Sequence, residues 1–551
     1  MGTPALAGLD KTARISIALS DGLGEYTGTW TTTEVAHLLK RTLFGVTVND
    51  LNYFSSRTMS QSVDELLTPT AVPATVPLNS YSSGGYTDPT GVAAWTTWIN
   101  TGVDYPDADM NALRLDSLKC WWIGQMLNEN RSIQEKLTLF WHNHFGVDTL
   151  LHLVDIPARP WYDYYLILRS NALGNMKQLV KEMTLSPAML CYLNGNTNKK
   201  TSPNENYGRE LQELYVIGKG VGSQYTEDDV RAAARVLTGH TVDSYFNYTF
   251  DVAGHDDKNK PFSNFYGSTI ITGRSGSAGA TELDDLLNMI FNTQEAAKFI
   301  CRQLYSFFVY YKIDDNIENN IIIPLAQVFR SSGYDITQVM SVLLKSDHFY
   351  NMAYSSACLI KSPLDFTLGL MREFQVKMPD PSDFGASYSA WEMILRTTSL
   401  LQQEILRIPE VAGWYAYYQG TAYHELWINS VTYTQRNAFT DQMITSGDMM
   451  GMVSLLIDPL AFAASLANPG DPNLLLSESL DVLYRVPLSA ETIASLKQTI
   501  LLGGLTTDYY WTSAWNAYLA NPTDPIAMGT VFSRLQTLYK YLMNLPEYHL
   551  S

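Results

Sequence analysis

The densest group of ionisable side chains in the sequence lies in residues 203–240, PNENYGRELQELYVIGKGVGSQYTEDDVRAAARVLTGH. Apolar residues recur at helical spacing on both sides of the glycine-rich GKGVGS, which predicts two short helices joined by a turn. The charged positions on these helices are Glu205, Arg209, Glu210, Glu213, Glu227, Asp228, Asp229, Arg231 and Arg235. Such a cluster can bind a metal ion through its carboxylates or hold an anion through its arginines.

Glu210 and Glu213 fall on one stripe of the first helix, directly beside its apolar face. Carboxylates that are partly withdrawn from water need a cation or hydrogen-bond donors nearby. In one interpretation, salt bridges from this stripe to Arg231 and Arg235 lock the two helices together. In the other, the two carboxylates are catalytic acid or base groups or metal ligands, and Arg209, Arg231 and Arg235 hold an anionic substrate.

The position of Glu213 also predicts an unequal effect of two alanine substitutions. Glu213 is four residues from Arg209 and close to the arginines of the second helix, so Glu213→Ala should leave a partly buried guanidinium without its partner. Glu227 lies in the first turn of its helix, where a carboxylate gains mainly from the helix dipole. We therefore expect Glu213→Ala to destabilise the protein more than Glu227→Ala.

A second candidate is the aromatic block FWHNHFG at residues 140–146. Its histidines, His142 and His144, are two residues apart and point to opposite sides of a helix, but to one side of an extended chain. The glycine that closes the block predicts a helix end, which would let the two rings converge. The pair can bind a divalent metal ion together with Glu210 and Glu213, or be buried histidines with backbone partners. In both cases we expect them to lie near residues 203–240.

A third candidate is the pair His255 and Asp256 in a polar turn. A His–Asp pair can be catalytic, but turns also collect these residue types simply because they are solvated. His240, at the end of the second charged helix, can join the first cluster or merely be stabilised by the helix dipole.

Composition excludes several classes of function. The chain has 551 residues, of which 46% are hydrophobic, and this is ample for a core. A formal net charge of −18 without a basic block disfavours a nucleic-acid or anionic-membrane partner. No run of about 18 apolar residues predicts a membrane span. The four scattered cysteines match no metal motif, and the motifs of nucleotide-binding proteins, serine hydrolases, zinc peptidases and EF-hands are absent.

The hydrophobic pattern predicts an all-α fold, a large assembly of helices with one small β-hairpin at 241–272 around a GHDDKNK turn. Alternating strand–helix units are absent, which argues against a doubly wound sheet. We divide the chain into an extended N-terminal segment at 1–30, a helical half at 31–280 and a second helical half at 281–551, packed as one continuous unit. Residues 68–108 predict a long irregular loop.

Ordered stretches along most of the chain resemble the motifs of DUF1800, a large bacterial family described as a domain of unknown function. They are HLLKRTLFG at 37–45, EKLTLFWHNHFG at 135–146, PAMLCYLNG at 187–195, PNENYGRELQELYVIG at 203–218, YTEDDVRAAARVLTGHT at 225–241, HDDKNKPF at 255–262, KSPLDF at 361–366 and PEVAGWYAYYQGTAYHELWINS at 409–430. One departure is Gly208, where the family pattern implies alanine; a glycine there weakens the helix slightly.

The resemblance implies more about the cellular location and partners of the protein than about its chemistry. The family has no assigned activity, and its members are typically exported and often encoded beside a protein of the sulfatase/alkaline-phosphatase class. This implies a periplasmic or secreted location. The N-terminus MGTPALAGLDKT shows no signal peptide, so either the protein is not exported or a signal has been removed. The resemblance also implies one polar pocket built from 142–144, 205–213, 228–240 and 255–256.

Two functions therefore stay open. The first is a metal-assisted hydrolase, in which a metal held by the histidines and glutamates polarises an anionic substrate or activates water. The alternative is a non-catalytic partner or scaffold of the neighbouring sulfatase/phosphatase-like protein, with loops 68–108 and 409–429 making the contact.

Overall fold

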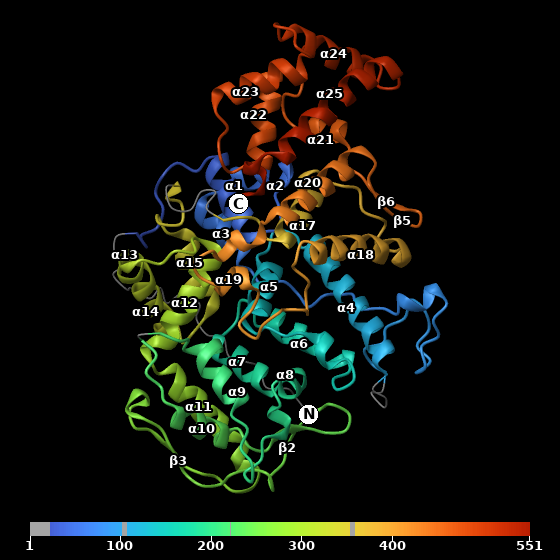
Figure 1. Ribbon diagram of the computed structural model, residues 1–551. Helices are drawn as coiled ribbons and strands as arrows, with labels where there is room; N and C mark the ends of the chain where they lie inside the picture. Colours follow the sequence, from blue (N-terminus) through green and yellow to red (C-terminus); the bar gives the residue numbers. More distant parts are fainter. Residues whose placement is uncertain (1–21, 102–106, 221, 353–358) are drawn as a thin grey trace, which may run out of the picture.

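The molecule is organised around α5 (Gln134–His144), a helix whose residues are all buried. Its computed structural model describes residues 22–101, 107–220, 222–352 and 359–551, and Figure 1 shows α5 in the middle of the molecule. A helix enclosed on all sides has no solvated face, so each of its polar side chains needs a partner within the protein.

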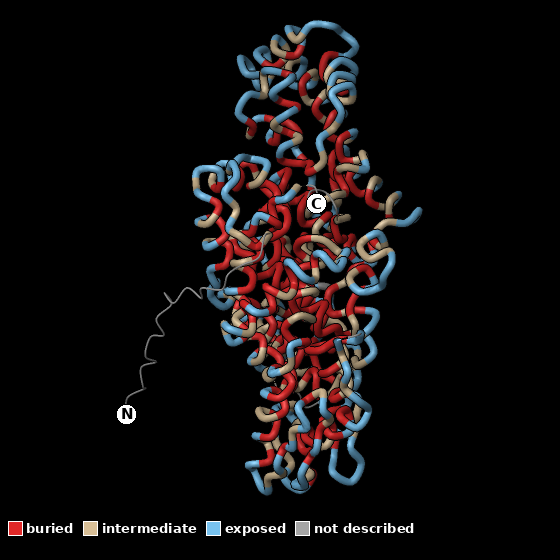
Figure 2. Tube along the Cα trace, turned by 90° about the vertical axis from the view of Figure 1, so that its left-hand side faces the viewer, coloured by how far each residue is buried: buried red, intermediate tan, exposed pale blue. Residues whose placement is uncertain are grey.

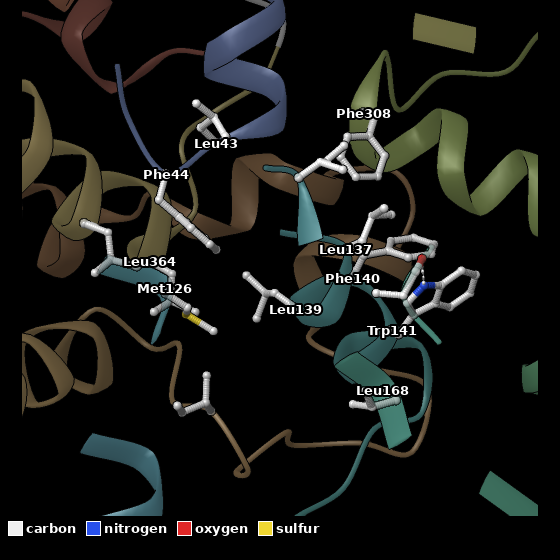
Figure 3. Close-up of a cluster of buried hydrophobic side chains, with 14 of the residues drawn as sticks. Leu43, Phe44, Met126, Leu137, Leu139, Phe140, Trp141, Leu168, Phe308 and Leu364 are labelled. Atoms are coloured by element: carbon white, nitrogen blue, oxygen red, sulfur yellow. Dashed lines mark hydrogen bonds between the residues drawn. The ribbon is translucent and has the colours of Figure 1, made fainter. Parts of the chain in front are cut away.

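The core around α5 is built by segments that are far apart in the sequence. Figure 3 shows four α5 side chains packed with residues of five other segments: Leu137, Leu139, Phe140 and Trp141 with Leu43, Phe44, Met126, Leu168, Phe308 and Leu364. The indole N–H of Trp141 donates to the carbonyl of Ala172 at 3.1 Å, so even the polar atom of this ring is satisfied inside the core.

Helices form most of residues 32–192, and the described residues between α3 and α4 are largely irregular, in agreement with the predicted loop. Three of them start at a threonine that forms a capping box: Thr31, Thr47 and Thr58. The helices are α1 (Thr32–Thr42), α2 (Val48–Ser55), α3 (Met59–Leu66), α4 (Ala108–Asn128), α5, α6 (Ala158–Ser170), α7 (Met176–Leu185) and α8 (Pro187–Tyr192).

The charged stretch forms two helices, as predicted. The first is α9 (Asn206–Glu210), which continues without a break as the π-helical segment η4 (Leu211–Val216). The second is α10 (Glu227–Val236), which starts at a capping box between Thr226 and Asp229.

The single hairpin predicted at 241–272 is wrong in detail, because two separate antiparallel pairs form there. They are β1 (His240–Val242) with β2 (Tyr248–Phe250), and β3 (Lys260–Pro261) with β4 (Ile270–Ile271). The first pair turns at Asp243, whose carboxylate accepts the backbone N–H groups of Tyr245 and Asn247. The GHDDKNK segment connects the two pairs instead of closing one hairpin.

A third pair, β5 (Asp448–Met450) with β6 (Val453–Leu455), interrupts a region predicted to be helical throughout. Gly447 and Gly451 have φ values of 75° and 61°, a left-handed conformation that glycine adopts readily and that ends helices. The all-α class with small β excursions is otherwise confirmed.

The remaining helices occupy residues 282–544, and those numbered α22 to α25 stand together at one end of the molecule (Figure 1). They are α11 (Glu282–Phe291), α12 (Gln294–Phe308), α13 (Asp315–Ile317), α14 (Ile323–Ser331), α15 (Ile336–Lys345), α17 (Pro363–Glu373), α18 (Phe384–Leu400), α19 (Tyr415–Tyr418), α20 (Ser430–Thr445), α21 (Pro459–Ser465), α22 (Pro472–Leu483), α23 (Ala490–Leu496), α24 (Tyr509–Ala520) and α25 (Pro525–Asn544).

After α25 the chain returns to the body, where the N–H of Lys361 donates to the carbonyl of His549 at 2.8 Å. Figure 2 shows the buried core running along the elongated molecule beneath an exposed surface. Within the described ranges, no helix combines the length and apolar character that a bilayer crossing requires. The N-terminal segment expected at 1–30 lies mostly outside the described residues, and the boundary placed at 280 stays a prediction.

Candidate functional site

The two charged helices approach each other at backbone distance. A Cβ atom added to Gly208 would lie 3.1 Å from the backbone nitrogen of Ala234 and 3.4 Å from the carbonyl oxygen of Val230. The glycine that departs from the family pattern therefore sits where α9 meets α10, and it permits this close contact.

The predicted salt bridges from the glutamate stripe to Arg231 and Arg235 are wrong. Arg231 instead contacts Asp228, one turn earlier on its own helix, at 2.5 Å, and its side chain is 59% exposed. Arg235 lies 2.7 Å from Asp256, which is outside the helix pair. Arg231 also lies 3.7 Å from Glu205, at the start of α9, and the buried residues of α10 are apolar apart from Asp229.

Arg209 makes the main ionic link between the two helices. Its two terminal nitrogens lie 2.8 and 2.7 Å from the two carboxylate oxygens of Glu227, and one of them is also 3.2 Å from Glu205. The hydrogen bonds from Arg209 lower the pKa of the Glu227 carboxyl. Because Glu227 is exposed, this pair stabilises the protein only weakly.

Glu210 and Glu213 have no arginine partner in the part of the chain that the structure describes. Glu213 contacts Lys219, whose side chain is 71% exposed. Partial burial, and then the negative charge of Glu213, raise the pKa of Glu210. The stripe is thus a half-buried acidic surface and not the centre of an interhelical ion network.

This geometry changes the expectation for the alanine substitutions. Glu213→Ala removes only a contact with an exposed lysine, so we expect it to cost less than about 1 kcal/mol of unfolding free energy. Glu227→Ala breaks a two-point contact with Arg209, but on a side chain that is 61% exposed. Urea unfolding of both variants should give nearly equal midpoints; a much larger loss for Glu213→Ala would restore the original prediction.

His144 is buried against the first charged helix, as predicted. Its Nε2 lies 2.8 Å from the carbonyl oxygen of Tyr215, which belongs to the last turn of η4. Carbonyls in a last helical turn lack partners within the helix, and His144 supplies one. Burial lowers the pKa of His144 to about 4, so its ring is neutral at neutral pH.

His142 points elsewhere, and both of its ring nitrogens are occupied. Nδ1 lies 2.9 Å from the hydroxyl of Tyr164, which itself donates to the carbonyl of Phe145. Nε2 accepts the backbone N–H of Leu406 at 2.9 Å. Burial lowers the pKa of His142 to about 3. The ring is therefore a neutral connector between α5, α6 and the segment before residue 409.

The proposed metal ligands do not form a coordination site. Neither His142 nor His144 is hydrogen-bonded to Glu210 or Glu213. Among all residues with described positions, no group of three or more His, Cys, Asp or Glu side chains could hold a metal ion. A metal role for these four residues stays a prediction, and the arrangement gives it no support.

His255 and Asp256 have separate hydrogen-bond partners, and His255 is not solvated; a catalytic role for them stays a prediction. His255 is 2% exposed, with Nδ1 2.8 Å from the carbonyl of Thr238 and Nε2 3.2 Å from Glu282. Lys260 lies 2.5 Å from the other oxygen of Glu282, and both of these side chains are fully buried. This ion cluster fixes residues 255–260 against α11.

Asp256 and His240, which lie near His255, also have hydrogen-bond partners within the protein. The carboxylate of Asp256 is partly buried, yet hydrogen bonds from Arg235 and from the N–H of Lys258 hold its pKa below the usual value. His240 does not join the charged helices: its Nδ1 lies 2.9 Å from the hydroxyl of Tyr248. The single pocket expected to combine all these segments is therefore not formed by them.

A different polar cluster surrounds a pocket that the sequence did not single out. We call it the basic pocket. Its cavity volume is about 50 Å³, which is room for a small group only. It lies between α1, α5, α12, α17, α19 and the 3₁₀-helical turn η8 (Tyr423–Trp427). Its charged and polar walls include Lys40, Arg41, Lys136, Ser362, Asp365, Tyr417 and His424.

Lys136 and Asp365 form an ion pair at this pocket. The lysine comes from α5 and is 4% exposed; the aspartate comes from the first turn of α17 and is 21% exposed. Asp365 also accepts the hydroxyl of Ser362 at 3.0 Å. Burial lowers the pKa of Lys136, and the charge of Arg41 adds to this effect while Asp365 opposes it.

Lys40 lies deeper and forms an ion pair with a carboxylate behind the pocket wall. Its Nζ is 2.7 Å from Glu373, which also lies 3.7 Å from Lys361. Burial lowers the pKa of Lys40 to about 7, with Glu373 opposing the shift and Lys361 reinforcing it. Two lysines thus share one buried carboxylate, which leaves positive charge in excess.

His424 presents a hydrogen-bond donor that no described group accepts. Its Nδ1 accepts the backbone N–H of Ile360 at 3.0 Å, so the ring proton is on Nε2. Nε2 is buried and has no partner. Burial, and then the charge of Arg41, lower the pKa of His424 to about 4, which keeps this N–H a neutral donor.

The sequence motifs that line this pocket were identified in the sequence, but their part in a common pocket was not predicted. Lys40 and Arg41 lie in HLLKRTLFG, Lys136 in EKLTLFWHNHFG, and Asp365 in KSPLDF. A usable signal existed, since these cations stand among apolar residues in stretches of helix that are buried. A buried cation needs an anionic or hydrogen-bonding partner.

Fold and site together define an all-α protein whose interior holds a lysine- and arginine-lined pocket. The chain matches the family model described as "Protein of unknown function (DUF1800)" over residues 37–550 and belongs to that family. A comparison with curated proteins gave no match, and a comparison with solved structures gave none either.

Proposed function

We propose that the protein binds a small anionic group, such as a carboxylate, sulfate or phosphate, in the basic pocket. One observation carries this proposal: the buried Nε2–H of His424 has no acceptor among the described residues, and it belongs to a pocket whose wall also carries Lys40, Arg41 and Lys136. Lys40 and Lys136 are already paired with Glu373 and Asp365. An anion would add to these ion pairs and accept the N–H of His424.

The proposal keeps one part of the sequence-based prediction, an anionic ligand, and moves it to other residues. Metal-assisted hydrolysis at His142, His144, Glu210 and Glu213 stays a prediction. So do a scaffold role beside a sulfatase/alkaline-phosphatase-like protein and a periplasmic or secreted location, which rest on the family resemblance alone. The 409–429 segment, predicted to contact a partner, supplies Tyr417 and His424 to the pocket wall.

Thermal unfolding in the presence of added anions tests the proposal. At constant ionic strength, sodium sulfate, phosphate or acetate should raise the melting temperature of the wild type, because a ligand that binds only the folded state stabilises it. The variant Lys136→Met should lose most of this response, because it removes a cation from the pocket and keeps Asp365. A matched control is Lys345→Met, which removes the lysine of a pair whose aspartate is 62% exposed. Equal responses in all three proteins would refute the site.

The pKa of Lys40 predicts a pH dependence of anion binding. Lys40 is charged below about pH 7 and loses its proton as the pH rises through that value. Sulfate keeps its charge over this range, so its affinity should fall above about pH 7, by at most about tenfold per pH unit. Sulfate titrations at several pH values should show this fall in the wild type and a flatter profile in Lys40→Met. An affinity that rises with pH would contradict the assignment.

A further inference from the structure

Arg436, in α20, is a fully buried cation with most of its hydrogen-bonding capacity unused. Its exposed fraction is 0%, and its Nη2 donates to the carbonyl oxygen of Lys361 at 2.8 Å. Its Nε and Nη1 atoms are buried without any partner among the described residues. The guanidinium carbon lies 4.8 Å from the centre of the Phe366 ring.

His549, near the end of the chain, is equally short of partners. It is 1% exposed, and both of its ring nitrogens are buried without a hydrogen bond. Its ring stacks on Phe366 at 5.4 Å with an interplanar angle of 25°. The backbone of Lys361 joins the two residues, because its N–H donates to His549 while its carbonyl accepts from Arg436.

The local charges do not balance. Burial lowers the pKa of Arg436 to about 9, so the group remains a cation at neutral pH. Asp365 is the carboxylate that acts on it, but the oxygens of Asp365 are used by Lys136 and Ser362. Burial, with the charges of Arg436 and Lys361, lowers the pKa of His549 to about 3, so its ring is neutral and carries one N–H. A buried cation and unused donors of this kind are unfavourable unless an acceptor is present.

We propose that a small monovalent anion of halide size, with chloride as the natural candidate, binds between Arg436 and His549. The surroundings favour a halide over an oxyanion for two reasons. The free donors are few, and the ring of Tyr433, 5.3 Å from that of His549, adds a further aromatic wall to that of Phe366. A phosphate or sulfate requires more donors than these groups supply. The site is separate from the basic pocket, whose lining does not include Arg436 or His549.

The bound halide would join three segments that pack together around Phe366. Phe366 belongs to α17, Arg436 to α20, and His549 to the final 3₁₀ turn (Pro546–His549). An anion held by residues of α20 and of the chain end fastens that end to the body, so the halide acts as a structural ligand.

Thermal unfolding of the full chain in sodium bromide, sodium chloride and sodium gluconate at equal ionic strength tests this. The wild type should melt roughly 1–3 °C higher in bromide or chloride than in gluconate, because a site-bound anion stabilises the folded state. Arg436→Met, which replaces the cation by an apolar chain of similar length, should fold and lose the difference. The exposed control Arg396→Met should keep it, and so should Lys345→Met, which removes the lysine of a distant pair and leaves Asp365 in place.

Crystals soaked in sodium bromide and measured at the bromine absorption edge locate the ion. We expect an anomalous peak within hydrogen-bonding distance of Arg436 and His549, and no such peak in Arg436→Met. A halide effect on melting that persists in Arg436→Met, or a site that holds only water in the bromide crystals, would overturn the proposal. These outcomes leave the sulfate response of the basic pocket untouched, so the two claims fail independently.

Discussion

Lys260→Met is expected to lower the free energy of unfolding by roughly 3–5 kcal/mol, because it leaves the carboxylate of Glu282 buried without its cation. Lys260 and Glu282 are both fully buried, and the contact between them is 2.5 Å long. A control is Lys258→Met, two residues away on an exposed side chain, where we expect a change within about 0.5 kcal/mol.

The double variant Lys260→Met/Glu282→Gln separates loss of the ion pair from loss of packing. Removing both charges should recover a large part of the stability, since an uncharged amide is much less costly to bury than a lone carboxylate. Urea unfolding followed by circular dichroism measures all three variants. If Lys260→Met and Lys258→Met unfold at the same midpoint, Glu282 is not held as the structure shows.

Lys136→Met should produce a loss of similar size, roughly 3–5 kcal/mol, because Asp365 then remains near the core without its lysine. Lys136→Met/Asp365→Asn should regain most of this loss. The surface pair Lys345–Asp64, disrupted in the same way, should change stability by no more than about 1 kcal/mol. Guanidinium unfolding of the four proteins measures the contrast. A single variant no weaker than the surface control would mean that the pair is solvated.

Much of the fold follows from local patterns in the sequence. Helical spacing of apolar residues predicted the two charged helices, and the capping box at Thr226 fixes where the second begins. The GHDDKNK turn was misassigned because its polar letters resemble a solvated turn. In the structure, His255 and Lys260 are buried, and both contact the carboxylate of Glu282, which belongs to a helix further along the chain.

The candidate site was harder to predict, for a physical reason. The high density of charged residues in the sequence pointed to residues 203–240. Charged residues that are close in sequence also form exposed ion pairs on the surface, as Arg231 and Asp228 do. Lys136 and Asp365 are 229 residues apart and meet only through tertiary packing. The aromatic block around His142 did predict burial, and both of its histidines are hydrogen-bonded to other segments within the core.

Calorimetric titration of sodium sulfate into the wild type and into Lys136→Met tests the central claim most directly. The account predicts saturable binding of about one sulfate in the wild type, weakened at least tenfold in Lys136→Met and unchanged in the control Lys345→Met. One site is expected because the cations Lys40, Arg41 and Lys136 line a single pocket. Absence of binding in the wild type, or equal affinity in Lys136→Met, would contradict the assignment of the basic pocket as an anion site.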